Sequence, residues 1–376
     1  MRGCGRTFDD ARPVIEETFL FAGVEGWYGE ESRASTSALD QPSMSSTPIP
    51  PAPAGAGAVA NGRTLRPLRL CLVDMNNGHV NQAMRCLRGL AATFFERVQT
   101  HNPGVLCEIV EVSPRDTNAP IPTDCDLYLS SGGPGSPFDG EGEPWTCDFG
   151  RLVDGVVESA IRGGADRRAL FAICYSFELV VHHYRLADVV PRADRKFGVM
   201  PIYTTPVGQQ HPLLAPFGDR LFAFEHRNWE AVNLDGHRLG SLGGKLLALE
   251  SRDGVSKGRA ILGLQVAPGV EAVQFHPEAD RAGVMNWVAR PEQAAAFKAT
   301  YGEVTYQAML RTLDDPRRLA RTYALVIPGW LGRCFNEIAA HRGYAELPPL
   351  EDAPCSRFGA HCRAEEAARA REVPRL

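Results

Sequence analysis

The chain of 376 residues lacks several features that assign proteins to broad classes. No uninterrupted apolar run approaches the roughly 20 residues that cross a bilayer, so we expect no membrane-spanning helix and no membrane partner. The N-terminus has no basic stretch followed by an apolar one, so no secretory signal is expected. The net charge of −5 comes without a concentrated basic segment, which argues against general nucleic-acid binding.

Signatures of bound cofactors are missing as well. The ten cysteines show no regular spacing and no C-x-x-C pair, which argues against both a disulfide scaffold and a zinc site. The chain also has no Gly-x-x-x-x-Gly-Lys-Ser/Thr loop of the kind that binds ATP phosphates. We therefore expect neither a cofactor nor a metal, and the free thiols favour a cytoplasmic location.

The composition of the first part of the chain differs from that of the rest. Residues 32–62 are rich in Ser, Pro, Ala and Gly, and such a segment buries too little apolar surface to offset its ordering entropy. We expect residues 1–66 to be a disordered extension, with Met44 as a second candidate for the translation start.

Apolar strand-like segments alternate with helical ones from residue 67 onward. This alternation predicts an α/β fold, an open and mainly parallel sheet with helices on both faces. Shorter strands later in the chain are expected to extend the sheet with antiparallel pieces. The predicted strands are 68–74, 106–112, 126–130, 169–173, 198–204, 221–225, 245–250, 260–266 and 270–275, and the predicted helices 81–98, 149–161 and the segment after 174.

The remainder of the chain is expected to be mostly helical. We predict a domain of residues 67–285, then a helical C-terminal extension of residues 286–349 packed on it, and a flexible tail of residues 350–376. The predicted helices of the extension are 291–310, 316–323 and 330–341.

One cysteine stands at a position typical of a nucleophile. Cys174 follows the apolar run 169–173 and precedes an amphipathic segment, so a strand, a sharp turn and a helix are predicted around it. The small residues Ala172 and Ser176 two places either side leave room for such a turn. A helix N-terminus behind Cys174 favours the thiolate. A buried structural cysteine is the alternative for an isolated residue of this kind.

Two further motifs favour the catalytic interpretation. The loop Ser131-Gly132-Gly133-Pro134-Gly135 follows a predicted strand, where backbone N–H groups can stabilise an oxyanion. The segment His276-Pro277-Glu278 places an imidazole and a carboxylate two residues apart, on the same side of an extended chain. A cysteine, a base and an orienting carboxylate together make a nucleophilic triad.

In these three motifs the chain resembles class I glutamine amidotransferase domains, over about residues 68–278. The family signatures are Gly-Gly-Pro-Gly, Gly-x-Cys-x-Gly and His-Pro-Glu, and the Cys-Tyr pair is similar to that of the glutaminase domain of GMP synthetase. The resemblance implies a flavodoxin-like sheet, with Cys174 as nucleophile, His276 as base and Glu278 as orienting acid. It implies oxyanion-hole N–H groups from Gly133 and Tyr175. It also places Gly132 and Glu178 in the substrate site.

The chain departs from the family pattern at three positions. Ala172 and Ser176 replace the two elbow glycines, and Glu178 replaces the glutamine that helps to hold substrate. A carboxylate at position 178 can pair with a substrate amine but repels a nearby carboxylate. Since an unpaired buried charge is costly, we expect Glu178 to pair with a protein cation or a substrate amine.

Three other polar residues have two interpretations each. Asn76 and Asn77 follow the first predicted strand, where they either face the site or form a turn, and turn-forming asparagines are commoner. His226 follows a later strand, where it either lines the pocket or packs as a structural histidine, the interpretation that we favour.

The leading functional interpretation is an amide hydrolase that releases ammonia from glutamine for a separate synthetase, since no ATP-binding signature is present. One alternative is a hydrolase of γ-glutamyl peptides or related amides without ammonia transfer, which Glu178 favours. A second is a non-catalytic regulatory protein of the same fold, against which the complete set of triad residues argues. In each enzymatic case the partner is a small-molecule amide.

Overall fold

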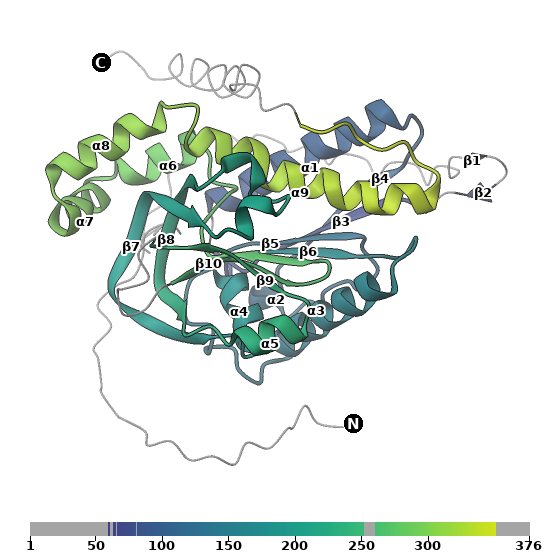
Figure 1. Cartoon of the computed structure of the whole chain (residues 1–376), viewed down its shortest axis with the longest axis horizontal. Helices are drawn as coiled ribbons and strands as arrows, with labels where there is room; N and C mark the ends of the chain where they lie inside the picture. Colours follow the sequence, from purple (N-terminus) through teal and green to yellow (C-terminus); the bar gives the residue numbers. More distant parts are fainter. Residues whose placement is uncertain (1–58, 61–62, 65, 80, 252–259, 351–376) are drawn as a thin grey trace, which may run out of the picture.

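The computed structural model describes residues 59–60, 63–64, 66–79, 81–251 and 260–350 (Figure 1). The predicted N-terminal extension and C-terminal tail therefore lie almost wholly outside the described residues. At the end of the former, Val59–Ala60 (β1) and Arg63–Thr64 (β2) pair as two short antiparallel strands.

The other strands of the described chain form one sheet of nine, in the order β4-β3-β5-β6-β11-β10-β9-β7-β8. The first five in this order pair in parallel, and from β11 onward every pair is antiparallel. The predicted α/β class, with a parallel sheet extended by antiparallel strands, is confirmed. The strands are Leu68–Val73 (β3), Cys107–Val112 (β4), Leu127–Ser130 (β5), Ala169–Ile173 (β6), Asp188–Thr204 (β7), Arg220–Val232 (β8), Lys245–Leu249 (β9), Ile261–Ala267 (β10) and Val270–Val273 (β11).

The hairpin of β7 and β8 is much longer than the strands predicted at 198–204 and 221–225. Two prolines, Pro191 and Pro201, lie within β7, and proline is tolerated in a strand only where no ladder hydrogen bond is lost. The sheet allows this because β7 pairs with β9 only through its last two residues, Tyr203 and Thr204. Most of β7 therefore has a single strand partner, β8.

Helices cover both faces of the sheet (Figure 1). Successive side chains of β3 point to opposite faces of the sheet. Leu70 and Leu72 pack in the apolar cluster that includes α1 and α9. Cys71 and Val73 pack in the apolar cluster that includes α3 and α4. The predicted helices on both faces are confirmed. The helices are Gln82–His101 (α1), Pro114–Thr117 (α2), Pro144–Arg162 (α3), Tyr175–His183 (α4), Gly236–Ser241 (α5), Arg281–Val288 (α6), Pro291–Tyr301 (α7), Glu303–Leu313 (α8) and Leu319–Arg342 (α9).

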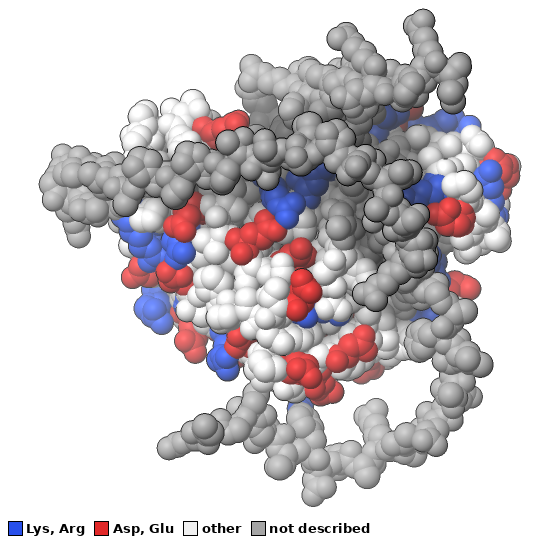
Figure 2. Space-filling model, turned by 180° about the vertical axis from the view of Figure 1, so that it is seen from behind, with Lys and Arg blue, Asp and Glu red and all other residues white. Residues whose placement is uncertain are grey.

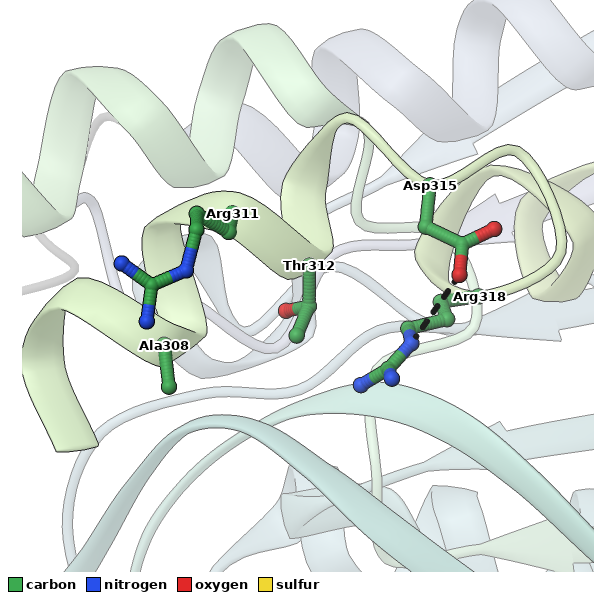
Figure 3. Close-up of a pocket in the computed structure, with 5 residues that line it drawn as sticks. All are labelled: Ala308, Arg311, Thr312, Asp315 and Arg318. Atoms are coloured by element: carbon green, nitrogen blue, oxygen red, sulfur yellow. Dashed lines mark hydrogen bonds and ion pairs between the residues drawn. The ribbon is translucent and has the colours of Figure 1, made fainter.

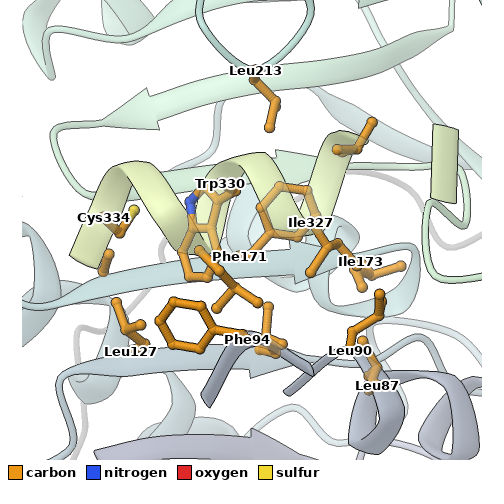
Figure 4. Close-up of a cluster of buried hydrophobic side chains, with 14 of the residues drawn as sticks. Leu87, Leu90, Phe94, Leu127, Phe171, Ile173, Leu213, Ile327, Trp330 and Cys334 are labelled. Atoms are coloured by element: carbon orange, nitrogen blue, oxygen red, sulfur yellow. The ribbon is translucent and has the colours of Figure 1, made fainter. Parts of the chain in front are cut away.

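The last helix, α9, is part of the main core. Figure 4 shows Trp330 and Ile327 of α9 among side chains of the sheet and of α1. The Trp330 ring lies 5.4 Å from that of Phe171 in β6, and its Nε1 donates a hydrogen bond of 2.9 Å to Oε2 of Glu271 in β11. A buried tryptophan of this kind contributes strongly to core stability. The predicted boundary between a domain of residues 67–285 and an extension of residues 286–349 remains a proposal. Side chains of α9, in the predicted extension, belong to the same apolar core as those of the predicted domain.

The C-terminal helices differ in extent from the predicted ones. The predicted helix 291–310 is two helices, which separate at Gly302 with a φ of 84°. The predicted helices 316–323 and 330–341 are one helix, α9, with Pro328 inside it. A proline inside a helix costs about 3 kcal/mol, and burial of Ile327 and Leu331 on either side offsets this cost.

The helices α6, α7 and α8 pack on the β7–β8 hairpin and form a third apolar cluster, which includes Phe197, Phe224, Trp287 and Phe297. These aromatic rings meet mostly edge to face, as between Phe197 and Trp287. The early part of the predicted extension thus packs on the β7–β8 end of the sheet.

The surface of the described chain carries both signs of charge. Figure 2 shows Lys and Arg interspersed with Asp and Glu on one face. None of the helices within the described ranges is long and apolar enough to cross a membrane.

Candidate active site

Cys174 lies in the turn between β6 and α4, so the predicted strand, turn and helix are all present. Its φ of 50° and ψ of −104° are rarely adopted by a residue other than glycine. Such backbone strain costs on the order of 1–3 kcal/mol and is found mostly at functional sites. The backbone N–H of Cys174 donates a hydrogen bond of 2.8 Å to Val273 O, which anchors the turn to β11. The turn therefore holds the thiol at the N-terminus of a helix.

The side chains of His276 and Glu278 form a buried pair just after β11. Nδ1 of His276 lies 2.8 Å from Oε1 of Glu278, and at most 1% of either residue is exposed. The backbone N–H of His276 donates to Phe224 O at 2.8 Å, which ties this segment to β8. Burial lowers the pKa of His276, but the Glu278 carboxylate and Cys174 outweigh it and raise that pKa well above its usual value. The imidazole is therefore protonated at neutral pH.

The glycine loop after β5 packs against both of these segments. A Cβ atom on Gly132 would lie 2.9 Å from Cε1 of His276 and 3.3 Å from Cβ of Cys174. Only glycine allows this close approach of the backbone. Cys174 is close enough to His276 to contribute to the raised pKa of the imidazole. The three predicted motifs thus meet where β5, β6 and β11, neighbours in the sheet, come to their carboxyl ends.

Gly133 and Tyr175 lie on the two sides of this meeting point. A Cβ on Gly133 would lie 2.1 Å from the carbonyl oxygen of Met75, so a larger residue is excluded there too. Tyr175 is the first residue of α4, and the N–H groups of a first helical turn have no carbonyl partner within their own helix. The oxyanion-hole role of these two backbone N–H groups remains a prediction.

Arg115, which the sequence analysis missed, connects these two segments. Its Nη1 donates hydrogen bonds of 2.8 Å to the carbonyl oxygens of both Met75 and Pro134. Its guanidinium carbon lies 4.1 Å from the ring centroid of Tyr175. Arg115 lies in α2, shortly after the carboxyl end of β4, and the rule that ligand sites lie at carboxyl ends of strands was the available signal.

The serine that replaces an elbow glycine has a structural role. Oγ of Ser176 donates to the carbonyl oxygen of Ser131 at 2.7 Å and lies 2.7 Å from Oγ of Ser130. Oγ of Ser131 in turn accepts from the backbone N–H of Met75 at 2.9 Å. These buried hydrogen bonds fix the glycine loop against the start of α4, a contact that glycine could not make.

Glu178 is buried one turn after Cys174, and only 3% of it is exposed. Its Oε1 accepts a hydrogen bond of 2.9 Å from Nε2 of Gln274, and the same Nε2 lies 3.8 Å from Sγ of Cys174. Burial raises the pKa of Glu178 to about 7, although Gln274 and the charge of Arg227 lower it. The direct partner of Glu178 is thus an amide, whereas we expected a protein cation or a substrate amine.

Asn76, Asn77 and His226 each had two possible roles. Asn76 is buried and its Nδ2 donates to Oγ of Ser131 at 3.4 Å, so it supports the glycine loop. Asn77 is exposed with a φ of 54°, so it has the turn-forming role. The backbone oxygen of His226 lies 3.9 Å from Sγ of Cys174, and its ring packs against those of Phe224 and Trp287.

One surface pocket lies away from Cys174, at the end of α8 (Figure 3). It is lined by Ala308, Arg311, Thr312, Asp315 and Arg318. None of the predicted site residues lines it. Within the ranges that the structure describes, no group of three His, Cys, Asp or Glu side chains is arranged to hold a metal ion.

No protein-family model matches the chain, and no curated protein does. The crystal structure of SMU.1228c matches with a TM-score of 0.50 and 17% identity, over 71% of this chain and 99% of that one. A glutamine amidotransferase from Thermotoga maritima matches with a TM-score of 0.46 and 14% identity, over 72% of this chain and 98% of that one.

A glutamine amidotransferase from Methylobacillus flagellatus also matches, with a TM-score of 0.47 and 17% identity, over 75% of this chain and 97% of that one. In fold, the chain is similar to class I glutamine amidotransferase domains. The resemblance inferred from the motifs is confirmed at this level. Similarity at such identities concerns the fold, and an activity has to follow from the side chains of the site.

Proposed function

We propose that this chain is a cysteine-dependent amide hydrolase of the glutamine amidotransferase type. The observation that carries the proposal is the placement of Cys174, on a strained left-handed turn beside the buried pair of His276 and Glu278. A strained nucleophile next to a paired imidazole is the arrangement that covalent amide hydrolysis needs.

In the first half of the reaction, the Cys174 thiolate attacks the carbonyl carbon of a side-chain amide. The N–H groups of Gly133 and Tyr175 stabilise the oxyanion that forms. The imidazolium of His276 gives its proton to the leaving nitrogen, the C–N bond breaks, and ammonia or an amine departs. A thioester on Cys174 remains.

In the second half, neutral His276 takes a proton from a water molecule, which attacks the thioester carbon. The C–S bond breaks, the carboxylic acid leaves, and the Cys174 thiolate with protonated His276 is restored. Glu278 orients the imidazole and stabilises its charged form in both halves. Gly132 and Glu178 border the substrate in this proposal.

With glutamine as substrate, the products are glutamate and ammonia. Because the sequence has no phosphate-binding loop of the Gly-x-x-x-x-Gly-Lys-Ser/Thr type, the ammonia would serve a separate synthetase chain. A reducing cytoplasm would keep the thiol competent.

A second candidate is a hydrolase of γ-glutamyl peptides or related amides that transfers no ammonia. The hydrogen bond between Glu178 and Gln274 favours it, since a titrating carboxyl next to Cys174 alters the site that would hold glutamine. Ammonia release from glutamine, compared with amine release from a γ-glutamyl dipeptide, separates the two candidates.

The test of the shared mechanism uses both substrates with the native chain and Cys174→Ala. We expect hydrolysis of at least one substrate by the native chain and a loss of more than about 10³-fold in the variant. Full activity of Cys174→Ala would contradict the proposal. Absence of hydrolysis by the native chain, alone and with candidate synthetases, would support a non-catalytic protein instead.

A further inference from the structure

A cation lies beside the proposed site, on the hairpin of β7 and β8. Nη2 of Arg195 in β7 donates a hydrogen bond to Nε2 of His226 in β8, and lies 3.4 Å from Oε1 of Gln293 in α7. The backbone oxygen of the same His226 is the group that lies 3.9 Å from Sγ of Cys174. One residue, His226, thus separates the Arg195 guanidinium from the thiol.

The protonation state of His226 fixes the direction of this contact. Burial and the positive charges of Arg195 and His276 lower the pKa of His226 well below its usual value. The ring is therefore neutral, and its Nε2 accepts the hydrogen bond from Arg195.

Aromatic rings hold the guanidinium in place. Its central carbon lies 4.9 Å from the ring centroid of Phe197 and 5.4 Å from that of Trp287 in α6. Gln293, which is 4% exposed, reaches it from α7. The helices that follow His276 and Glu278 in the chain therefore supply part of the surroundings of Arg195.

What Arg195 lacks is an acidic partner. Across the described ranges no carboxylate forms an ion pair with it, and its buried Nε has no hydrogen-bond partner there. Burial lowers the pKa of Arg195, yet a guanidinium remains charged. The next residue, Lys196, shows the usual arrangement, with its Nζ 2.9 Å from Oε1 of Glu250. An unmatched half-buried cation is costly unless an anion binds to it.

We propose that Arg195 is the docking point for a carboxylate of the substrate. The identity of this ligand rests on the proposed function, because a γ-glutamyl amide carries an α-carboxylate and a γ-glutamyl peptide carries a second one on its leaving group. The buried Nε without a hydrogen-bond partner leaves one donor of the guanidinium for a ligand, and the planar guanidinium matches the geometry of a carboxylate. The helices α6 and α7 thereby take part in substrate recognition.

Calorimetry with Cys174→Ala, which cannot turn over its ligand, tests the proposal. The probes are γ-glutamylglycine and its two amidated forms, one with the α-carboxylate and one with the glycine carboxylate replaced by an amide. Adding Arg195→Gln should weaken binding of γ-glutamylglycine by about 10–100-fold, the range of a charge-assisted hydrogen-bonded pair. One of the two amidated forms should bind weakly to Cys174→Ala, and its affinity should not fall further when Arg195→Gln is added. The carboxylate that is missing from this form is the one that Arg195 binds.

Arg220→Gln is the matched control. Arg220 lies on the same hairpin, and its guanidinium carbon is 5.3 Å from the ring centroid of Phe222, so it shares the stacking but lies at the far end from His226. Its substitution should leave all three affinities within about twofold, well below the effect of a lost ion pair. Arg195→Lys, which keeps the charge without the fork, should bind with intermediate affinity.

Equal affinities of Arg195→Gln and its parent for all probes would overturn the inference, as would the absence of binding by Cys174→Ala. If Arg195→Gln fails to fold, the affinities of Cys174→Ala for the three probes test the inference without it. Equal affinities for γ-glutamylglycine and both amidated forms would then overturn the inference. Binding that depends on Arg195, in a native chain that hydrolyses none of the probes, would support the docking point while contradicting the proposed hydrolysis.

Discussion

Nε2 of Gln274 donates a hydrogen bond of 2.9 Å to Oε1 of Glu178, and both side chains are buried beside Cys174. This contact joins the last strand before the proposed base to the first turn of the helix after the proposed nucleophile. Since burial raises the pKa of Glu178 to about 7, the carboxyl group changes charge near neutral pH. The position at which the chain departs from the amidotransferase pattern is therefore also one that titrates in the physiological range.

We predict that above pH 7 the Glu178→Gln variant has a larger free energy of unfolding than the native chain. The folded pKa of about 7 lies above the usual value of 4.5, so the folded state binds the extra proton and the free energy of unfolding falls as pH rises from about 4.5 to 7. A shift of this size corresponds to about 3 kcal/mol at most. Urea unfolding of both chains at pH 5 and pH 8 measures the difference. An equal stability difference at both pH values would contradict the raised pKa.

The same substitution should change the handling of glutamine. An ionised Glu178 repels the carboxylate of a bound amino acid, so we expect the native chain to hydrolyse glutamine poorly at pH 8. Glu178→Gln should raise kcat/KM for glutamine about tenfold there, and by much less at pH 5.5, where the native carboxyl is protonated. Ammonia release measures both values, with Glu158→Gln as a control on an exposed acid of α3. Efficient native hydrolysis, unchanged by Glu178→Gln, would show that this position does not set specificity.

His276 and Glu278 should contribute unequally. His276 transfers protons, so His276→Ala should approach the loss caused by Cys174→Ala, whereas Glu278→Gln should retain roughly 10–100-fold more activity. Because the Glu278 carboxylate raises the pKa of His276, Glu278→Gln should also move the alkaline limb of the kcat/KM profile to lower pH. A greater loss for Glu278→Gln than for His276→Ala, or an unmoved limb, would mean that the roles are wrongly assigned.

A single methyl group on Gly132 should abolish activity. Its Cβ would lie 2.9 Å from Cε1 of His276, so Gly132→Ala has to displace either the imidazole or the loop. We expect kcat to fall by at least about 100-fold while the thermal midpoint changes little. The control is Gly89→Ala in α1, where an added Cβ meets nothing within 4 Å. Full activity of Gly132→Ala would contradict the close packing of this loop on His276.

The sequence predicted the fold class and the meeting of three motifs, because both depend on local patterns. Buried runs such as 169–173 read directly as strands, and the elbow at Cys174 is marked by its small neighbours. The order of strands in the sheet brings β5, β6 and β11 together, so motifs far apart in the chain converge.

What the sequence could not reveal depends on long-range contacts. Arg115 lies in a stretch without a periodic pattern, and only the folded chain brings it to Met75 and Pro134. Gln274 lies two residues before His276 in the chain, but its contact with Glu178 requires α4 to lie against the end of β11. The continuity of α9 through Pro328 was missed because burial on the sheet outweighs the local cost of proline.

The alkylation rate of Cys174 tests the central claim most directly, because it needs no knowledge of the substrate. Iodoacetamide labelling with peptide mass mapping at pH 6 should modify Cys174 faster than the other nine cysteines, since it lies at a helix N-terminus beside His276, whose pKa is raised. Cys107 is a suitable comparison, because it is more exposed yet burial raises its pKa to about 11. The advantage of Cys174 should disappear in His276→Gln. Equal labelling of Cys174 and Cys107 at pH 6, or labelling of Cys174 that is unchanged in His276→Gln, would contradict an activated nucleophile at this position.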